Sequence, residues 1–329
     1  MPLLIKDVEI VTGSILVNNE DILSLYTGDK TNAKEFLESI GRNIRFHSNG
    51  INENTLTMAV EATNKVLKKR NLTGNDIDFI AFCSQFPEYT MPSQALILHH
   101  NIKGNEKCIT LDINANCLGM LRGLDVCNRY FNDKKGDIKR ALLIGSDYAS
   151  RCTYNDELVT LGSFSDGACA LLLEYTDDES IGIIGSSDRS ISSEAYGCIF
   201  PQCGMSNIDE NNINYIKTMW TNPDTSLSVK AMKESLSDVL NKHSMSESDI
   251  DWYCGSQFAE PFFNEVGDAC KIQKEKRVYV GDKYGYTGTS SPFFAFYEAV
   301  NDGRIKQGDV VFFTTVGVGI SVCSMLVRI

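Results

Sequence analysis

The sequence predicts a mixed α/β fold built from two similar halves, and three observations lead to that prediction. Amphipathic helical segments alternate with strands that are apolar along their whole length, which is typical of sheets covered by helices on both faces. A helix, a polar turn and a strand recur in register 173 residues apart, at 58–82 and 231–254. The chain of 329 residues is long enough for two such units.

The first half is expected to span residues 1–175. Its repeated segment has a helical apolar pattern that ends at Leu67, a polar turn and the triplet Asp76-Ile77-Asp78 before an apolar strand. The later elements are a strand, a tight turn, a helix and two more strands, at 107–113, 114–116, 117–131, 141–146 and 168–175.

The second half is expected to span residues 176–329. Its repeated segment carries the matching triplet Asp249-Ile250-Asp251 and is followed by a helix and two strands, at 292–303, 310–316 and 320–329. The stretch from about 186 to 226 is rich in Ser, Asn, Gly and Pro and breaks the periodicity. We therefore expect an inserted loop region there, and such long loops often carry function.

Charge and hydropathy exclude two classes of partner. The formal net charge is -12, from 31 basic and 43 acidic residues, and no basic run offsets it, so the chain repels nucleic acid at long range. No window reaches the roughly 18 apolar residues of a membrane span, and the N-terminus lacks the pattern of a signal peptide. We expect a cytoplasmic protein that binds neither nucleic acid nor membrane.

The 11 cysteines support neither a disulfide framework nor a metal site. Their number is odd, and they form no CxxC pair and no Cys/His cluster at zinc spacing. Most stand inside apolar runs such as IAFCSQ and GACALLL, where cysteine is a small buried hydrophobe. We therefore expect no metal.

One cysteine differs from the others in its position. Residues 107–113 predict a strand, Asn114 to Asn116 a tight turn, and Cys117 the first residue of a helix. Unpaired backbone N–H groups and the positive end of the helix dipole lower the pKa of a thiol at such a place and favour the thiolate. Two interpretations remain open from position alone: Cys117 is a nucleophile, or it is one more buried cysteine.

Five motifs, in order along the chain, resemble those of β-ketoacyl-acyl-carrier-protein synthase III, a family with the thiolase fold. They are DINANCLGM (112–120), SFSDGACALLLE (163–174), DIDW followed by Ser-Gln (249–257), DKYGYTGTSSPFFAFYEAV (282–300) and VGVGISVCSMLVRI (316–329). The resemblance covers most of the chain. It implies a five-layered αβαβα core made from the two halves, normally in a homodimer.

The resemblance also assigns roles to residues. Cys117 matches the nucleophile that carries the acyl group as a thioester. The family's oxyanion hole combines the amide of this cysteine with a backbone N–H in the loop of Gly317, Val318 and Gly319, most directly that of Val318, and two fixed N–H groups stabilise a tetrahedral intermediate. Met91 matches a residue that the family extends across the dimer interface to line the partner's acyl pocket.

Two catalytic positions depart from the family. Its histidine aligns with Ser256 and its asparagine with Tyr286, at the family's separation of 30 residues. In decarboxylative condensation those two residues donate hydrogen bonds to a malonyl thioester as it becomes an enolate. Ser256 and Tyr286 can both donate, but Ser cannot act as a base near neutral pH and Tyr crowds the malonyl pocket. None of the four histidines occupies a recognised site: His47, His99, His100 and His243.

The donor site departs as well. The family clamps the adenine of coenzyme A between a Trp and an Arg, whereas the two tryptophans here are Trp220 and Trp252 and Leu158 stands where the Arg would be. No such pair occurs around residues 36–45, although Arg42 and Arg45 are nearby. A thioester of an acyl carrier protein, which needs no adenine pocket, is therefore the favoured donor, and coenzyme A thioesters are the alternative.

These observations favour a ketosynthase III-like acyltransferase without a cofactor of its own, in which Cys117 takes an acyl group and a second substrate removes it. The replaced donors favour a specialised lipid, polyketide or other secondary-metabolite pathway over ordinary initiation of fatty acid biosynthesis. The alternative is a catalytically impaired partner subunit of a heterodimeric ketosynthase. A third hypothesis, a carrier-protein-binding scaffold, has only the acidic composition in its favour.

Overall fold

The computed structural model describes residues 3–133, 137–211, 213–221 and 224–329, which form two large sheets, two small two-stranded sheets and three layers of helices. The first sheet has the strand order β1-β7-β6-β4-β5. In this sheet β4 runs parallel to β5 and β6, and β7 runs antiparallel to β6 and β1. Its strands are β1 (Leu3–Thr12), β4 (Phe79–Cys83), β5 (Ile109–Ile113), β6 (Arg140–Asp147) and β7 (Gly167–Tyr175).

The second sheet has the strand order β11-β12-β13-β8. Here β11 runs parallel to β12, and the other two pairs are antiparallel. Its strands are β8 (Gly182–Ser190), β11 (Trp252–Gly255), β12 (Val310–Gly317) and β13 (Ser321–Arg328). All strands of the first sheet therefore precede those of the second along the chain.

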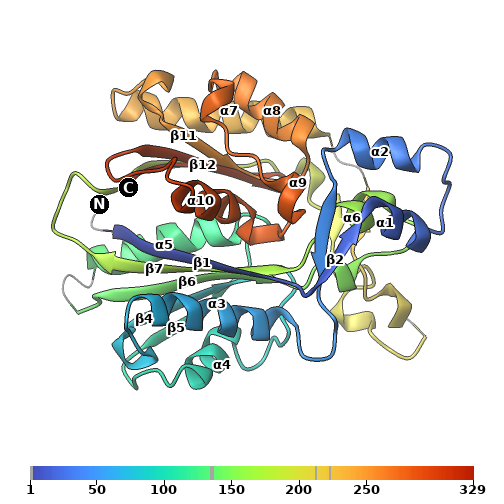
Figure 1. The fold of residues 1–329 in the computed structure, drawn as a ribbon, viewed down its shortest axis with the longest axis horizontal. Coiled ribbons are helices and arrows are strands. Elements are labelled where there is room, and N and C mark those ends of the chain that lie inside the picture. Colours follow the sequence, from blue (N-terminus) through green and yellow to red (C-terminus); the bar gives the residue numbers. More distant parts are fainter. Residues whose placement is uncertain (1–2, 134–136, 212, 222–223) are drawn as a thin grey trace.

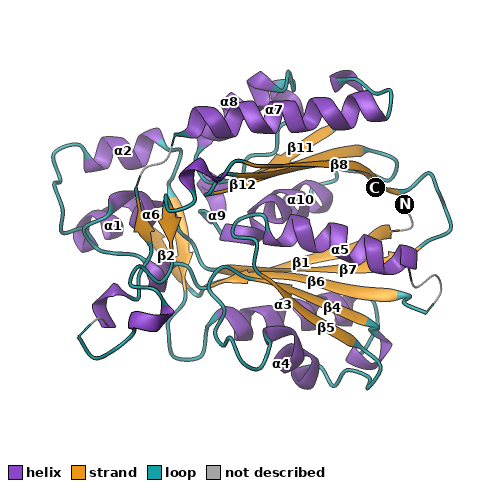
Figure 2. Ribbon diagram, turned by 180° about the vertical axis from the view of Figure 1, so that it is seen from behind, coloured by secondary structure: helices purple, strands orange, loops and turns teal. Residues whose placement is uncertain are grey.

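Helices separate and cover the two sheets, which gives five layers in the order αβαβα and confirms the predicted architecture (Figures 1 and 2). Two helices lie between the sheets, α5 (Gly119–Asp133) and α10 (Ser291–Asn301). The outer face of the first sheet carries α3 (Thr55–Lys69) and α4 (Gln94–Asn101). The outer layer over the second sheet consists of α7 (Thr225–Lys242) and α8 (Glu260–Ala269).

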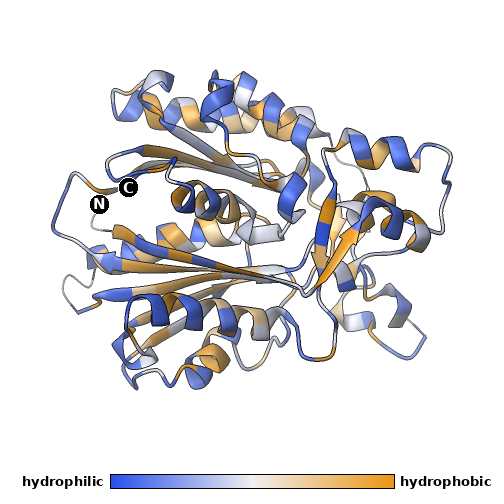
Figure 3. Cartoon of the chain, in the orientation of Figure 1, coloured by the Kyte–Doolittle hydropathy of each residue, from blue (hydrophilic) through white to orange (hydrophobic). Residues whose placement is uncertain are grey.

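Hydrophobic burial accounts for this layering. The strands β4, β6 and β7 are buried along nearly their whole length because helices cover both of their faces. The outer helices show an apolar side toward the sheets and a polar side toward solvent (Figure 3). One large cluster fills the space between the sheets, and two others lie under α3 and under α7.

The repeat predicted from the sequence is confirmed at the level of single hydrogen bonds. After α3 and α7, the chain passes through one left-handed residue, Asn71 (φ 55°) or Ser244 (φ 53°). Thr73 and Ser246 then begin a three-residue 3₁₀ turn, and each is capped by the aspartate three residues later. All three pairs of positions keep the offset of 173, so the two halves share one folding unit.

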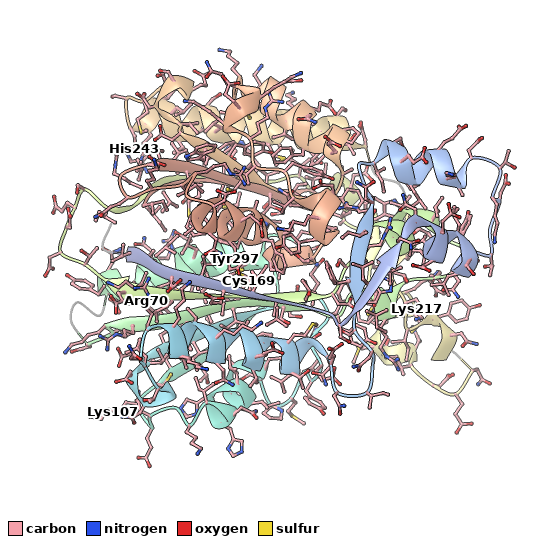
Figure 4. The ribbon with its side chains drawn as sticks, viewed as in Figure 1. Arg70, Lys107, Cys169, Lys217, His243 and Tyr297 are labelled. Carbon is pink, nitrogen blue, oxygen red and sulfur yellow. The ribbon has the colours of Figure 1, made fainter. Side chains whose placement is uncertain are left out.

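Two regions lie outside the layers. The first is a small lateral cluster at one end of the core, formed by β2 (Ile15–Asn18), β3 (Ile44–His47), α1 (Asn19–Leu25), α2 (Ala33–Ser39) and α6 (Leu158–Ser163). The second is the irregular segment between the halves, with the short strands β9 (Cys198–Ile199) and β10 (Met219–Trp220); Figure 4 labels Lys217 in it. This segment begins at Ile191 instead of about residue 186, because β8 continues to Ser190 as an edge strand.

No helix within the described residues combines the length and the hydropathy that a membrane span requires. No group of three or more His, Cys, Asp or Glu residues in the described ranges is arranged to hold a metal ion.

Candidate active site

Cys117 lies at the carboxyl end of β5, in the connection to α5. This edge is also where the parallel strands β4 and β6 end, so the loops that follow three neighbouring strands meet there. Asn116 adopts the left-handed conformation (φ 55°), and the Gly119 N–H donates to its carbonyl oxygen (3.0 Å). The resulting turn delays the start of α5 to Gly119, two residues later than predicted.

The prediction of a lowered pKa for Cys117 is wrong. Burial raises the pKa of this thiol to about 12, although the nearby Tyr286 hydroxyl favours the thiolate. The amides that would stabilise a thiolate have other acceptors. The Cys117 N–H donates to Asn116 Oδ1 (2.8 Å), and the Met120 N–H donates to Thr289 Oγ1 (2.7 Å).

Tyr286 reaches Cys117 from the second half of the chain. It follows the short helix α9 (Gly281–Tyr284), and its backbone bonds both neighbours of Phe164. Its ring packs against Phe164 (6.0 Å between centroids) and edge-on against Phe258 (5.3 Å). Burial and the neighbouring sulfur raise the pKa of the phenol well above its usual value, so it stays protonated and acts as a donor.

Ser256 follows β11 directly and is 2 % exposed. Its hydroxyl lies near that of Tyr286 and lowers the phenol's pKa slightly. No hydrogen bond of ordinary length and angle reaches Ser256 Oγ within the described part of the chain, and hydrogen bonds weaken steeply when they are misaligned. The structure thus brings Cys117, Ser256 and Tyr286 together, with one buried hydroxyl left unpaired.

These three side chains line one pocket with a volume of about 80 Å³. Aromatic rings dominate its wall, and the described lining residues include no Lys, Arg or His. Among the described lining residues, Asp224 is the one whose side chain is charged near neutral pH, and its charge is negative. The described lining residues are Gln85, Phe86, Asn116, Cys117, Phe164, Cys198, Trp220, Asp224, Thr225, Ser228, Ser256, Phe258, Phe262, Tyr286, Val316, Val318 and Ile320.

Gln85 and Asp147 belong to this site but were not predicted from the sequence. The Asp147 carboxylate is fully buried at the end of β6 and accepts hydrogen bonds from the Gln85 backbone (2.8 Å) and side chain (3.2 Å). Gln85 Oε1 in turn faces Cys117 Sγ at 3.4 Å. The one signal in the sequence is that both polar residues stand at the carboxyl ends of predicted apolar strands; the structure makes these strands, β4 and β6, parallel neighbours and pairs β4 with β5, which leads to Cys117.

Asp147 also connects the two halves of the chain. It accepts a hydrogen bond from the Thr289 N–H (3.2 Å), and a Cβ on Gly288 would lie 2.4 Å from both Asp147 Oδ2 and Gln85 Nε2. Gly288 has φ +62°, which also favours glycine. Thr289 therefore contacts both this carboxylate and the first turn of α5, so the loops around Cys117 hold one another in place.

The loop assigned to the oxyanion hole connects β12 to β13, beside Cys117. Val318 lines the pocket, and its N–H has no acceptor among the described residues. A Cβ on Gly317 would lie 2.6 Å from the Leu118 side chain. Because glycine has no Cβ, the loop can pack closely against Leu118, the residue directly before α5. Gly319 is not a lining residue.

Met91 does not line the pocket of its own chain, and its side chain is 87 % exposed. Its predicted role across a dimer interface stays a prediction, since one chain is described.

The residues near the expected adenine clamp have structural roles. Arg42 and Arg45 are fully buried, where Arg42 donates to the Gln257 carbonyl (3.0 Å) and Arg45 to the Gly162 carbonyl (2.8 Å). Leu158 packs against the lateral cluster. Trp220 lines the pocket beside Phe258 (5.4 Å between rings), with no partner for its buried indole N–H among the described residues.

Most of the other cysteines are packed in the core, as expected. Cys169 on β7, for example, belongs to the cluster between the sheets, against which Tyr297 of α10 packs (Figure 4). Cys108, Cys198 and Cys203 are partly exposed, and of these three Cys198 lines the pocket. Burial raises the pKa of its thiol to about 11.

Comparisons with known proteins agree with this geometry. The model of the 3-oxoacyl-[acyl-carrier-protein (ACP)] synthase III family matches residues 111–190, and that of its C-terminal part matches residues 240–329. The β-ketoacyl-[acyl-carrier-protein] synthase III of Erythrobacter litoralis is 31 % identical over 281 residues, 85 % of each chain. That of Histophilus somni (strain 2336) is 29 % identical over 279 residues, again 85 % of each chain.

Solved structures show the same fold. The 3-oxoacyl-[acyl-carrier-protein] synthase III of Aquifex aeolicus superimposes with a TM-score of 0.86 at 22 % identity, over 98 % of both chains. OleA of Xanthomonas campestris, solved with bound lauric acid and lauroyl-CoA, has a TM-score of 0.85 at 16 % identity, over 100 % of this chain and 99 % of that one. The chain has the thiolase fold and belongs to the β-ketoacyl-[acyl-carrier-protein] synthase III family.

Proposed function

We propose that the chain is an acyltransferase in which Cys117 accepts an acyl group from a thioester and a second substrate then removes it. In the first step Cys117 Sγ attacks the thioester carbonyl carbon, a new S–C bond forms, and the donor's thiol leaves with the cysteine proton. The observation that carries this proposal is the meeting of Cys117, Tyr286 and Ser256 at one apolar pocket. Cys117 is the nucleophile, and Tyr286 and Ser256 are hydrogen-bond donors to the reacting groups.

The polarity of the pocket supports a second substrate other than a malonyl thioester. A malonyl carboxylate would find no cationic side chain among the described lining residues, and Asp224 would repel it. Ser256 and Tyr286 also stand where the resemblance places the histidine and asparagine of decarboxylative condensation. We therefore propose a role in a specialised lipid, polyketide or other secondary-metabolite pathway, with an uncharged or cationic acceptor.

The buried arginines support an acyl carrier protein as the acyl donor, with acyl-coenzyme A as the second choice. Arg42 and Arg45 are occupied by backbone carbonyls, so neither is available to stack on an adenine. We further propose a homodimer in which Met91 enters the partner's pocket. All 11 cysteines are free, which favours a reducing, cytoplasmic location.

Intact-protein mass spectrometry tests the first step. The chain is incubated with acyl-coenzyme A and acyl-carrier-protein donors of several chain lengths, and the adduct is located by peptide mapping. The expected result is one acyl group on Cys117 that is absent from Cys117→Ala and retained in Cys198→Ala, the pocket cysteine that serves as control. No adduct with any donor, while iodoacetamide still alkylates Cys117, would refute the proposal.

One observation favours the alternative, a catalytically impaired partner subunit of a heterodimeric ketosynthase. With the pKa of Cys117 raised to about 12 and no histidine in the described pocket wall, the isolated chain lacks a base for its thiol. Co-expression with a ketosynthase that has an intact Cys-His-Asn set separates the two functions. Activity of the pair that survives Cys117→Ala would establish the partner role, and activity that is lost would exclude it.

A further inference from the structure

The carboxamide of Asn116 occupies the position where an acyl donor must place its carbonyl oxygen. Asn116 Oδ1 accepts a hydrogen bond from the Cys117 N–H at 2.8 Å and from the Cys117 thiol at 3.1 Å. Both contacts are made by one amide oxygen, which resembles a thioester oxygen in its geometry and polarity. Asn116 also lines the pocket, so an incoming donor meets this side chain directly.

The rest of the carboxamide points toward the other half of the expected oxyanion hole. Asn116 Nδ2 lies 3.5 Å from the Val318 carbonyl oxygen, and the Val318 N–H has no acceptor among the described residues. A Cβ on Gly317 would come within 3.2 Å of Asn116 Cβ, so this loop closely approaches the side chain. Of the two N–H groups expected to form the oxyanion hole, that of Cys117 already donates to Asn116 Oδ1, and that of Val318 has no acceptor among the described residues.

We infer that Asn116 limits the acylation of Cys117 by competing with the donor's carbonyl oxygen for the Cys117 N–H. This inference rests on the proposed acyltransferase function. The side chain must rotate away before the donor oxygen can use that N–H, and the negative charge that develops on the oxygen in the tetrahedral intermediate is then stabilised by Cys117 and Val318. No covalent bond to Asn116 forms or breaks.

The variant that tests this inference is Asn116→Gly, which removes the carboxamide and tolerates φ +55°. Loss of a competing hydrogen bond is expected to raise the rate of acylation about 3- to 10-fold. Asn116→Asp should have the opposite effect, because a carboxylate holds the Cys117 N–H more strongly and repels the developing oxyanion. The matched control is Asn71→Gly, an exposed asparagine with the same φ of 55°, which lies just after the outer helix α3 and does not line the pocket.

The readout is the ratio of two rates at Cys117 for each variant, acylation by the fastest donor of the mass-spectrometric panel and alkylation by iodoacetamide. Alkylation forms no oxyanion, so the ratio removes any change in the reactivity of the thiol itself. The ratio is expected to rise in Asn116→Gly, to fall in Asn116→Asp and to stay constant in Asn71→Gly.

The possible failures are distinguishable. If the wild-type chain is acylated but the ratio is unchanged in Asn116→Gly, Asn116 does not compete and the inference alone is overturned. If the ratio falls in Asn116→Gly, the carboxamide assists the reaction by donating through its nitrogen, which also overturns it. If neither chain is acylated by any donor although both are alkylated, the proposed function fails and this inference fails with it.

Discussion

Removing one hydroxyl group, in Tyr286→Phe, tests how the site controls its nucleophile. The Tyr286 hydroxyl lies beside Cys117 in an apolar pocket and can donate a hydrogen bond to the thiolate, which opposes the burial that raises the pKa of the thiol to about 12. Phenylalanine keeps the contacts with Phe164 and Phe258 but leaves the sulfur without this donor. The variant should therefore fold normally and react more slowly.

The magnitude follows from the pKa. At pH 8 a thiol with a pKa of about 12 is ionised to roughly one part in 10⁴, so alkylation should accelerate about tenfold for each pH unit between 7 and 10, without a plateau. A hydrogen bond to a charged group is worth about 1.5–3 kcal/mol. Its loss should raise the thiol pKa further and slow alkylation at least about tenfold at every pH in that range.

The assay is iodoacetamide alkylation of Cys117, followed by peptide mass spectrometry from pH 7 to pH 10. Tyr253→Phe is the control, because Tyr253 is equally buried, at 1 % exposed against 2 %, but lies in the cluster under α7 and does not line the pocket. A plateau in the wild-type rate below pH 9 would show that the thiol has a lowered pKa. Equal rates in Tyr286→Phe and the wild type would show that the hydroxyl does not stabilise the thiolate.

Three further predictions concern the stability of the chain, each measured by urea unfolding. Gly288→Ala should cost at least about 1–2 kcal/mol more than Gly303→Ala, because both glycines have positive φ but only Gly288 would bring a Cβ against Asp147; equal losses would contradict this. Burial lowers the pKa of His47 to about 4 in the folded chain, against 6.5 ordinarily, so its contribution is complete above pH 6.5 and is lost as the pH falls toward 4. Between pH 6.5 and pH 4 the free energy of unfolding should therefore fall by up to about 3 kcal/mol less in His47→Gln than in the wild type. An equal fall in both chains would disprove this prediction. Thr289→Val should cost about 1–2 kcal/mol, since it leaves an N–H of the first turn of α5 without its acceptor; a loss below 0.5 kcal/mol would mean that water replaces the hydroxyl.

Local patterns in the sequence were sufficient for most of the fold. The apolar runs predicted for β6, β7 and β12 agree with the structure to within one residue at either end. The agreement has a physical cause, since strands covered on both faces must be apolar throughout. The repeat at an offset of 173 was equally visible, because the same capping residues recur in both halves.

The interactions around Cys117 were less predictable. The motifs pointed to Cys117, Ser256 and Tyr286, and the structure brings them to one pocket. Gln85 and Asp147 were not found, because no local pattern shows that a carboxylate at the end of one strand will hold an amide at the end of its neighbour. The pKa of Cys117 was predicted in the wrong direction, because the helix begins two residues later and desolvation of the thiolate outweighs the effect of the Tyr286 hydroxyl.

The sequence by itself determined the α/β class, the duplicated halves and the cysteine most suited to chemistry, because each depends on residues close together in the chain. Only the tertiary structure decided that the wall around this cysteine is aromatic and that the described part of it offers no cation. It also decided that the thiol is held protonated and that the Asn116 amide oxygen occupies the Cys117 N–H. These properties come from burial and from contacts between loops of both halves, so they exist only once the two sheets have packed together.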